Sequence, residues 1–193
     1  LSTHSALPEA MFFMKLAHQR FEEVMASEFL DGIIVHETVK ANNTFSSVID
    51  TCHENNVDMI VMGSHGASGF KEMFIGSNAE KVVRTSDIPV LVIKNEHANF
   101  TVDNFVFASD FKKDNKETYK QAVDFAKSFN AKIHLLMVNT ANSFSTTEES
   151  NKRIKAFIKD YTFDNYTINI YNDETVEKGI LNFSKMIDAD LIG

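Results

Sequence analysis

Apolar residues follow two spacings along this chain, one typical of helices and one typical of strands. Long segments carry apolar residues three or four positions apart, whereas runs such as Met59–Met62 and Val90–Ile93 are short and continuously apolar. Strands separated by helices need crossover connections, and these build parallel sheets. The pattern therefore predicts an α/β protein. The expected helices are 8–29, 43–55, 78–85, 116–129, 150–161 and 175–187, and the expected strands are 33–39, 59–62, 90–93, 105–108, 133–138, 166–171 and 190–193.

These elements form two sets that are related by an internal repeat. The run Val57-Asp-Met-Ile matches Ala189-Asp-Leu-Ile, each at the start of a buried strand, and residues 96–103 break the periodicity as a linker would. Two tandem copies are therefore expected. Residues 1–95 would be the C-terminal part of the first domain and 104–193 the N-terminal part of the second, so that each copy is incomplete.

A glycine-rich segment lies between the strand 59–62 and the helix that follows it. Gly63, Gly66, Gly76 and Ser77 form the pattern Gly-x2-Gly-x9-Gly-Ser. Glycines let backbone N–H groups approach an anion closely, and a helix N-terminus adds partial positive charge. The segment is neither a Walker A loop nor the dinucleotide fingerprint. A single Gly-x-x-Gly would indicate an ordinary turn, but this context favours a phosphate or nucleotide site.

The glycine segment, with Val57–Gly63 before it and Ser86–Ile93 after it, resembles the ATP loop of the universal stress protein family. The resemblance implies a Rossmann-like fold, similar to the adenine nucleotide alpha hydrolases, with a parallel five-stranded sheet of order 3-2-1-4-5. It also implies ATP, AMP or ADP as ligand, Mg²⁺ only as a companion of ATP, and a role as a stress-response switch. It implies weak ATP hydrolysis at most, which leaves open whether the protein is an enzyme.

The resemblance also assigns site residues, which are divided between the two copies. Asp110, at the end of the strand 105–108, takes the position of the Asp that contacts adenine, and Val138 takes a position whose backbone contacts adenine. Asp110 is also explained as a turn residue that caps the next helix, and Val138 as a core residue. The first copy supplies the phosphate loop with Gly63, His65, Gly66, Gly76, Ser77 and Asn78.

Two other functions remain open on the sequence. Some proteins of this fold serve as interaction modules without binding ATP, although the glycine loop of this chain argues against that. Nucleotidyl-transfer and electron-transfer-flavoprotein-like enzymes share the architecture, but they would need catalytic residues that the sequence does not show.

Composition narrows the partners and the cellular compartment. The chain has 193 residues and a net charge of −8 with dispersed basic residues, which argues against nucleic acid as a partner. No apolar run reaches the length of a membrane span. The single cysteine, Cys52, excludes an internal disulfide framework and fits a reducing, cytoplasmic compartment. The seven histidines show no metal-ligand spacing, so no protein-held metal is expected.

Self-association is expected through the strand at 90–93. In the family that the chain resembles, the last strand pairs antiparallel across a two-fold or pseudo-two-fold axis. A homodimer or pseudo-dimer would therefore form through Val90, Leu91, Val92 and Ile93.

Overall fold

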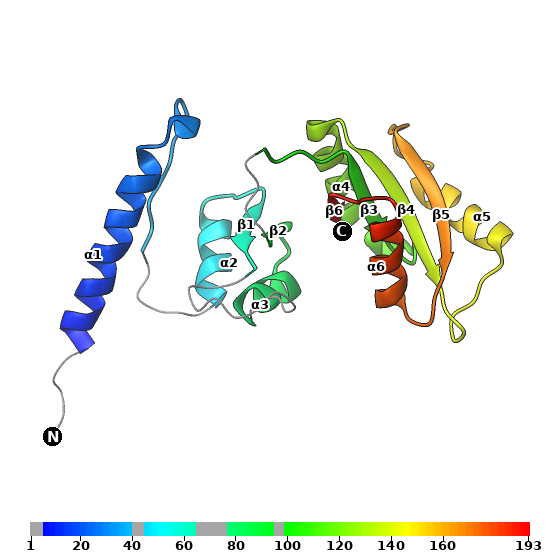
Figure 1. Ribbon diagram of the computed structural model, residues 1–193, viewed down its shortest axis with the longest axis horizontal. Helices are drawn as coiled ribbons and strands as arrows, with labels where there is room; N and C mark the ends of the chain where they lie inside the picture. Colours follow the sequence, from blue (N-terminus) through cyan, green and yellow to red (C-terminus); the bar gives the residue numbers. More distant parts are fainter. Residues whose placement is uncertain (1–5, 40–44, 65–76, 95–98) are drawn as a thin grey trace, which may run out of the picture. The chain divides into compact units, whose positions relative to one another are not determined.

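The computed structural model describes residues 6–39, 45–64, 77–94 and 99–193. The chain divides into two compact units, Leu1–Asn95 and Glu96–Gly193. Both units alternate helices with parallel strands, so the predicted α/β class is confirmed (Figure 1).

The first unit holds a two-stranded parallel sheet and its helices. Its elements are α1 (Ala6–Met25), the 3₁₀ helix η1 (Glu28–Leu30), α2 (Phe45–Glu54), β1 (Ile60–Gly63), α3 (Ser77–Thr85) and β2 (Val90–Ile93). In the sheet, Ile60 lies opposite Val90 and Gly63 opposite Ile93. A small core of Cys52, Ile60 and Val82 joins α2, β1 and α3.

The predicted strand at 33–39 is wrong. This segment has no strand pairing among the residues that the structure describes, and the Ile34 side chain is 85% exposed. An apolar run favours a strand, but a strand also needs a neighbour for its backbone N–H and C=O groups. Because the sheet described in this unit contains only β1 and β2, the segment at 33–39 has no such neighbour.

The second unit holds a four-stranded parallel sheet. Its elements are β3 (Asn104–Ala108), η2 (Lys113–Asn115), α4 (Lys116–Phe129), β4 (Lys132–Asn139), α5 (Thr147–Ile158), β5 (Tyr166–Asn172), α6 (Val176–Met186) and β6 (Leu191–Ile192). The strand order is β5-β4-β3-β6. The helices and strands predicted for 105–193 are therefore confirmed, with their ends shifted by at most three residues.

The chain reverses its direction across this sheet after β5. From β3 to β4 and β5 it moves one way, and its two connecting helices, α4 and α5, pack on the same face. It then returns past β3 to β6, so a right-handed crossover places α6 on the opposite face (Figure 1). The point of reversal therefore lies between β3 and β6.

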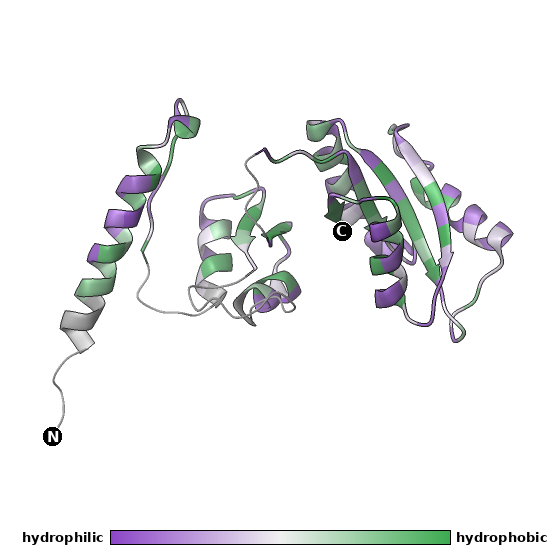
Figure 2. Ribbon diagram, viewed as in Figure 1, coloured by the Kyte–Doolittle hydropathy of each residue, from purple (hydrophilic) through white to green (hydrophobic). Residues whose placement is uncertain are grey.

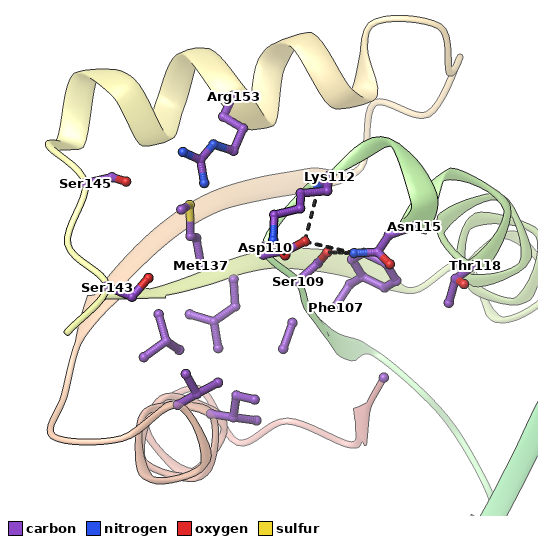
Figure 3. Close-up of a pocket in the computed structure, with 16 residues that line it drawn as sticks. Phe107, Ser109, Asp110, Lys112, Asn115, Thr118, Met137, Ser143, Ser145 and Arg153 are labelled. Atoms are coloured by element: carbon purple, nitrogen blue, oxygen red, sulfur yellow. Dashed lines mark hydrogen bonds and ion pairs between the residues drawn. The ribbon is translucent and has the colours of Figure 1, made fainter. Parts of the chain in front are cut away.

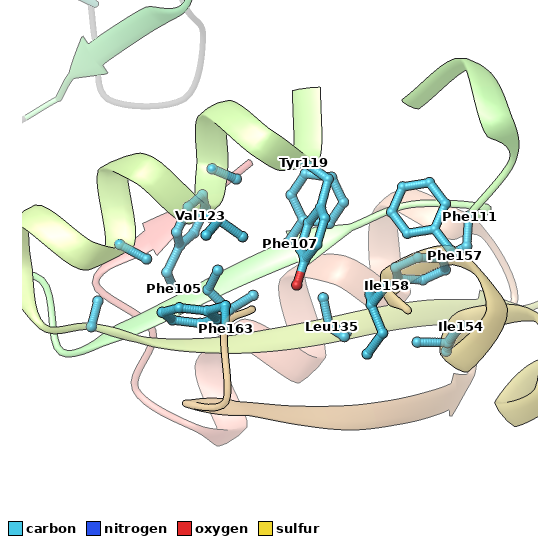
Figure 4. Packing of buried hydrophobic residues seen from close by; sticks show 14 of the residues in the cluster. Phe105, Phe107, Phe111, Tyr119, Val123, Leu135, Ile154, Phe157, Ile158 and Phe163 are labelled. Atoms are coloured by element: carbon cyan, nitrogen blue, oxygen red, sulfur yellow. The ribbon is translucent and has the colours of Figure 1, made fainter. Parts of the chain in front are cut away.

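The larger core of the second unit lies under α4 and α5 and is built from aromatic rings (Figure 4). The ring of Tyr119 lies 5.2 Å from that of Phe107 and 5.5 Å from that of Phe157, measured between ring centroids. Phe157 in turn lies 5.4 Å from Phe111. A smaller cluster under α6 contains Val106, Leu136 and Phe183. Figure 2 shows the resulting contrast between the hydrophobic strand β4 and the more hydrophilic helix α5.

The observed neighbours agree with the predicted order 3-2-1-4-5 as far as strands are described. In the second unit, β5, β4, β3 and β6 occupy the first four places of that order. In the first unit, β1 and β2 are neighbours, as its last two strands would be. Within the described residues neither unit completes a five-stranded sheet.

Candidate functional site

A pocket of about 600 Å³ lies at the carboxyl ends of the strands in the second unit (Figure 3). Residues from the end of β3, the end of β4, the first turns of α6 and Gly193 after β6 line it. In open parallel sheets, ligands bind outside the carboxyl ends of the strands where the strand order reverses. The pocket lies at this edge of the sheet, beside the reversal between β3 and β6.

The apolar side of the pocket depends on a close approach between α6 and β4. Val138, Val176 and Ile180 line the pocket. A Cβ atom added to Gly179 would lie 2.5 Å from Cγ1 of Val138, which is closer than two carbon atoms tolerate. Glycine at 179 therefore lets α6 pack directly against the end of β4 and bring its apolar residues to the pocket.

Asp110 lies on the rim of the pocket and organises the turn after β3. Its Oδ1 accepts hydrogen bonds from the backbone N–H of Lys112 at 3.1 Å and from Nδ2 of Asn115 at 3.0 Å. Its Oδ2 lies 2.7 Å from Nζ of Lys112. The hydrogen bond from Lys112 holds the pKa of the Asp110 carboxyl below its usual value. The residue is thus an ionised turn residue and a pocket residue at once.

Ser109 and Asn115 complete this turn. Ser109 Oγ accepts from the backbone N–H of Phe111 and from Nδ2 of Asn115, both at 3.0 Å. Asn115 is the residue before α4, but its side chain makes no capping bond there. The turn role suggested for Asp110 is confirmed, but its carboxylate does not cap α4, because the groups that it bonds belong to Lys112 and Asn115, both before α4 begins.

The loop after β4 and the helix α5 form another wall of the pocket, beside the apolar wall formed by α6 and β4. Asn139 is only 4% exposed, and its side chain bonds both the C=O and the N–H of Ser145. A bridge between Thr140 and Ser143 closes the loop. The loop is thereby fixed, and Ser143, Ser145 and Arg153 of α5 line the pocket.

Sequence reasoning missed this wall, together with Ser109, Lys112 and Asn115. The available signal was position, since residues directly after the carboxyl end of a parallel strand lie at the ligand edge. That rule points to the segment after β4, but it does not say which side chains turn inward. Arg153, in the second turn of α5, reaches the pocket only because of how that helix packs on the sheet.

In the first unit, the structure describes only the two ends of the glycine segment. Gly63 is the last residue of β1, and the backbone N–H of Ser64 donates to the C=O of Ile93 at 2.9 Å. Ser77 and Asn78 open α3, and their side chains are outside the described part. His65, Gly66 and Gly76 lie outside the described residues altogether. The predicted strand before the segment and the predicted helix after it are both present.

Within the residues that the structure describes, no helix combines the length and apolar character that crossing a membrane requires. That same part of the chain brings no three His, Cys, Asp or Glu side chains together in a way that would hold a metal ion.

A parallel sheet whose strand order reverses beside a pocket at its carboxyl ends defines the class of doubly wound α/β proteins. Comparison with known proteins narrows the class. Residues 3–94 match the model of the universal stress protein family. By this match the first unit is similar to universal stress protein domains.

Individual relatives match over shorter stretches. A universal stress protein of Methanocaldococcus jannaschii is 33% identical over 67 residues, which cover 35% of this chain and 41% of the relative. The universal stress protein YxiE of Bacillus subtilis is 41% identical over 59 residues, which cover 30% of this chain and 40% of the relative. The chain thus spans about two fifths of the length of these two curated relatives.

A solved structure resembles nearly the whole chain. The crystal structure of a universal stress protein from Archaeoglobus fulgidus aligns with a TM-score of 0.73 and 23% sequence identity. The alignment covers 99% of this chain and 70% of that chain. At this identity the likeness shows the fold.

Proposed function

We propose that this protein binds an adenine nucleotide, with ATP as the first candidate, and uses the binding as a switch in a stress response. The observation that carries the proposal is the pocket of the second unit, because Asp110 and Val138 both line it. These are the two positions that the family resemblance assigns to adenine recognition.

The peptide groups of Val138 support this proposal. The peptide groups of a strand point alternately toward its two neighbours, and the C=O of Leu136 accepts from Ser109 on the β3 side. The N–H and C=O of Val138, two residues further along β4, therefore point to the β3 side, as those of Leu136 do. Since β3 ends at Ala108, opposite Leu136, they are directed past its end. There they offer a donor and an acceptor to the edge of a base.

The size and lining of the pocket fit a nucleotide. A volume of about 600 Å³ lies within the usual range of small-molecule sites. Leu136, Val138 and Ile180 provide an apolar surface for a planar base, and Asp110 and the serine hydroxyls provide hydrogen-bonding groups around it. A mostly apolar pocket with a few polar groups is the usual composition of such sites.

The proposal for the first unit concerns the glycine segment. Its backbone N–H groups and the N-terminus of α3 would hold the phosphates of a nucleotide, and Mg²⁺ would arrive with ATP. Residues 1–95 would then be the C-terminal part of one universal stress protein domain. Residues 96–103 would be a linker, and 104–193 the N-terminal part of a second domain.

The pocket is tested with a pair of substitutions on one helix. Val176 lines the pocket and is 47% exposed, whereas Leu181 is 53% exposed and lies outside the lining. Val176→Glu places a carboxylate at the pocket without emptying the core. We expect the ATP affinity to fall by about tenfold or more, because the bound, negatively charged ATP would lie near this unpaired carboxylate of like charge. Leu181→Glu should leave the affinity unchanged. Calorimetric titration of ATP into each full-length variant measures both.

The glycine segment is tested separately. Replacing Gly66 and Gly76 with valine should weaken ATP binding if the first unit holds phosphates. Unchanged affinity in the Val176→Glu variant and in the glycine variant would contradict the nucleotide assignment. Failure of the wild-type chain to bind ATP, ADP or AMP would favour the alternative, an interaction module with this fold.

A further inference from the structure

The residues that line the pocket of the second unit carry more positive than negative charge. Lys112 and Arg153 are cationic and Asp110 is the carboxylate, in a chain whose net charge is −8. Asp110 and Lys112 already form an ion pair at 2.7 Å. The charge in excess at the pocket is therefore that of Arg153.

Two carboxylates act on Arg153 from a distance, and both have other partners. Arg153 contributes to the lowered pKa of Asp110, after Lys112, and to that of Glu149, after Thr146. Asp110 holds Lys112 and Asn115, as described above. Glu149 Oε2 accepts from the backbone N–H of Thr146 at 3.0 Å and from its hydroxyl at 2.9 Å.

Among the described residues, the guanidinium group of Arg153 forms no hydrogen bond or ion pair. A guanidinium group carries five N–H donors in a fork that matches the oxygens of phosphate or carboxylate. These donors remain available to a group that enters the pocket.

The neighbours of Arg153 at the pocket are also donors. In Figure 3, Arg153 extends from α5 toward the pocket, and Ser143 and Ser145 lie on the same side, on the loop after β4. The buried side chain of Asn139 fixes the backbone of Ser145. One cationic fork and two hydroxyls on a fixed loop can together donate to several oxygens of one anion. A phosphate group, with three terminal oxygens, uses such a set more fully than a carboxylate.

We propose that the second-unit pocket holds a phosphate group of its ligand against Arg153, with Ser143 and Ser145 as additional donors. The inference rests on the proposed function in taking a nucleotide as the source of this phosphate. It adds an anion subsite on the side of β4 and α5, separate from the glycine segment of the first unit. Inorganic phosphate has the same chemistry and is the other source to be tested.

The test compares ligands that differ only in the phosphate. Adenosine, AMP and inorganic phosphate are each titrated calorimetrically into the full-length wild type, Arg153→Gln and Lys152→Gln. Lys152 is an exposed cation on the same helix that does not line the pocket, so its substitution removes the same charge elsewhere. Arg153 is also solvent-exposed, so its substitution leaves the core intact.

We expect Arg153→Gln to weaken AMP binding by about tenfold or more, as the loss of a charge-assisted hydrogen bond does, and to leave adenosine binding unchanged. Arg153→Lys should restore part of the AMP affinity because it keeps the charge without the fork. Lys152→Gln should leave both ligands unchanged.

The outcomes separate this inference from the proposed function. If AMP and adenosine bind but Arg153→Gln leaves their ratio unchanged, the anion subsite is overturned and the nucleotide assignment stands. An equal effect of Lys152→Gln would overturn the subsite as well. If neither nucleoside ligand binds but inorganic phosphate binds in an Arg153-dependent way, the subsite stands and the nucleotide assignment fails.

Discussion

At the scale of single residues, Asp110 shows how one side chain serves both the fold and the site. The two oxygens of its carboxylate accept three hydrogen bonds in the turn after β3, and the residue also lines the pocket. The sequence left two roles open, a turn residue and a ligand residue. The structure shows that the same carboxylate holds the turn and lies at the pocket, so the two roles do not exclude each other.

The lowered pKa of Asp110 predicts a pH-dependent contribution to stability. A carboxyl whose pKa is lower in the folded state than in the unfolded chain stabilises the fold above its unfolded pKa, near 3.8, and this stabilisation is lost as the pH falls through the folded pKa. Asp110→Asn should therefore destabilise the protein at pH 7 and have little effect at pH 2. Because the side chain is 48% exposed, the effect should stay below about 1 kcal/mol.

Urea unfolding at both pH values measures this difference. Asp114→Asn is the control, since Asp114 is an exposed carboxylate nearby in the chain, in η2. A stability difference between wild type and Asp110→Asn that is equal at pH 7 and pH 2 would show that the Lys112 contact does not stabilise the fold.

At the scale of elements, local patterns predicted most helices and strands because their periods depend on neighbouring residues only. The helix at 116–129 is observed with those bounds, and strand 105–108 begins one residue earlier. The segment at 33–39 has a similar apolar pattern but forms no strand. Its pattern was a local property, whereas strand formation depends on a partner elsewhere in the chain.

The contact between α6 and β4 gives a prediction at this scale. Gly→Ala in a helix usually stabilises a protein by about 0.5–1 kcal/mol. At Gly179 the added methyl would collide with Val138, so Gly179→Ala should instead destabilise the fold by about 1–3 kcal/mol and weaken nucleotide binding.

The double variant Gly179→Ala, Val138→Ala isolates that contact. Removing the two γ-methyl groups of Val138 relieves the collision, so the second substitution should cost less in the Gly179→Ala background than alone. Thermal and urea unfolding of the four proteins measure the coupling. Additive effects would mean that α6 adjusts freely and that the close approach is not required.

At the scale of the whole molecule, the two units divide the candidate chemistry. The glycine segment belongs to the first unit, and Asp110 and Val138 belong to the second. Sequence reasoning found these positions because they follow strand ends and match a family pattern. It did not find Arg153, Ser143 or Ser145, because a side chain's direction toward a pocket depends on how a helix or loop packs over the sheet.

Self-association through β2 is the prediction for the whole molecule. Within the described first unit, β2 pairs with β1 alone, and its four residues are only partly buried. An apolar strand with a free edge can pair with another chain. We expect sedimentation and light scattering at micromolar concentration to show a dimer, and Leu91→Lys to weaken it. A strict monomer across that concentration range would contradict this pairing.

The sequence by itself determined the alternation of helices and strands, the parallel arrangement, the resemblance to the universal stress protein family and the positions of the glycine segment, Asp110 and Val138. All of these follow from short-range periodicity or from residues that are close together in the chain. The tertiary structure alone decided that the segment at 33–39 forms no strand. It also decided that α6 meets β4 at Gly179, and that Arg153 lines the pocket. Each of these depends on contacts between residues that are distant in the sequence, and such contacts arise only when the elements pack.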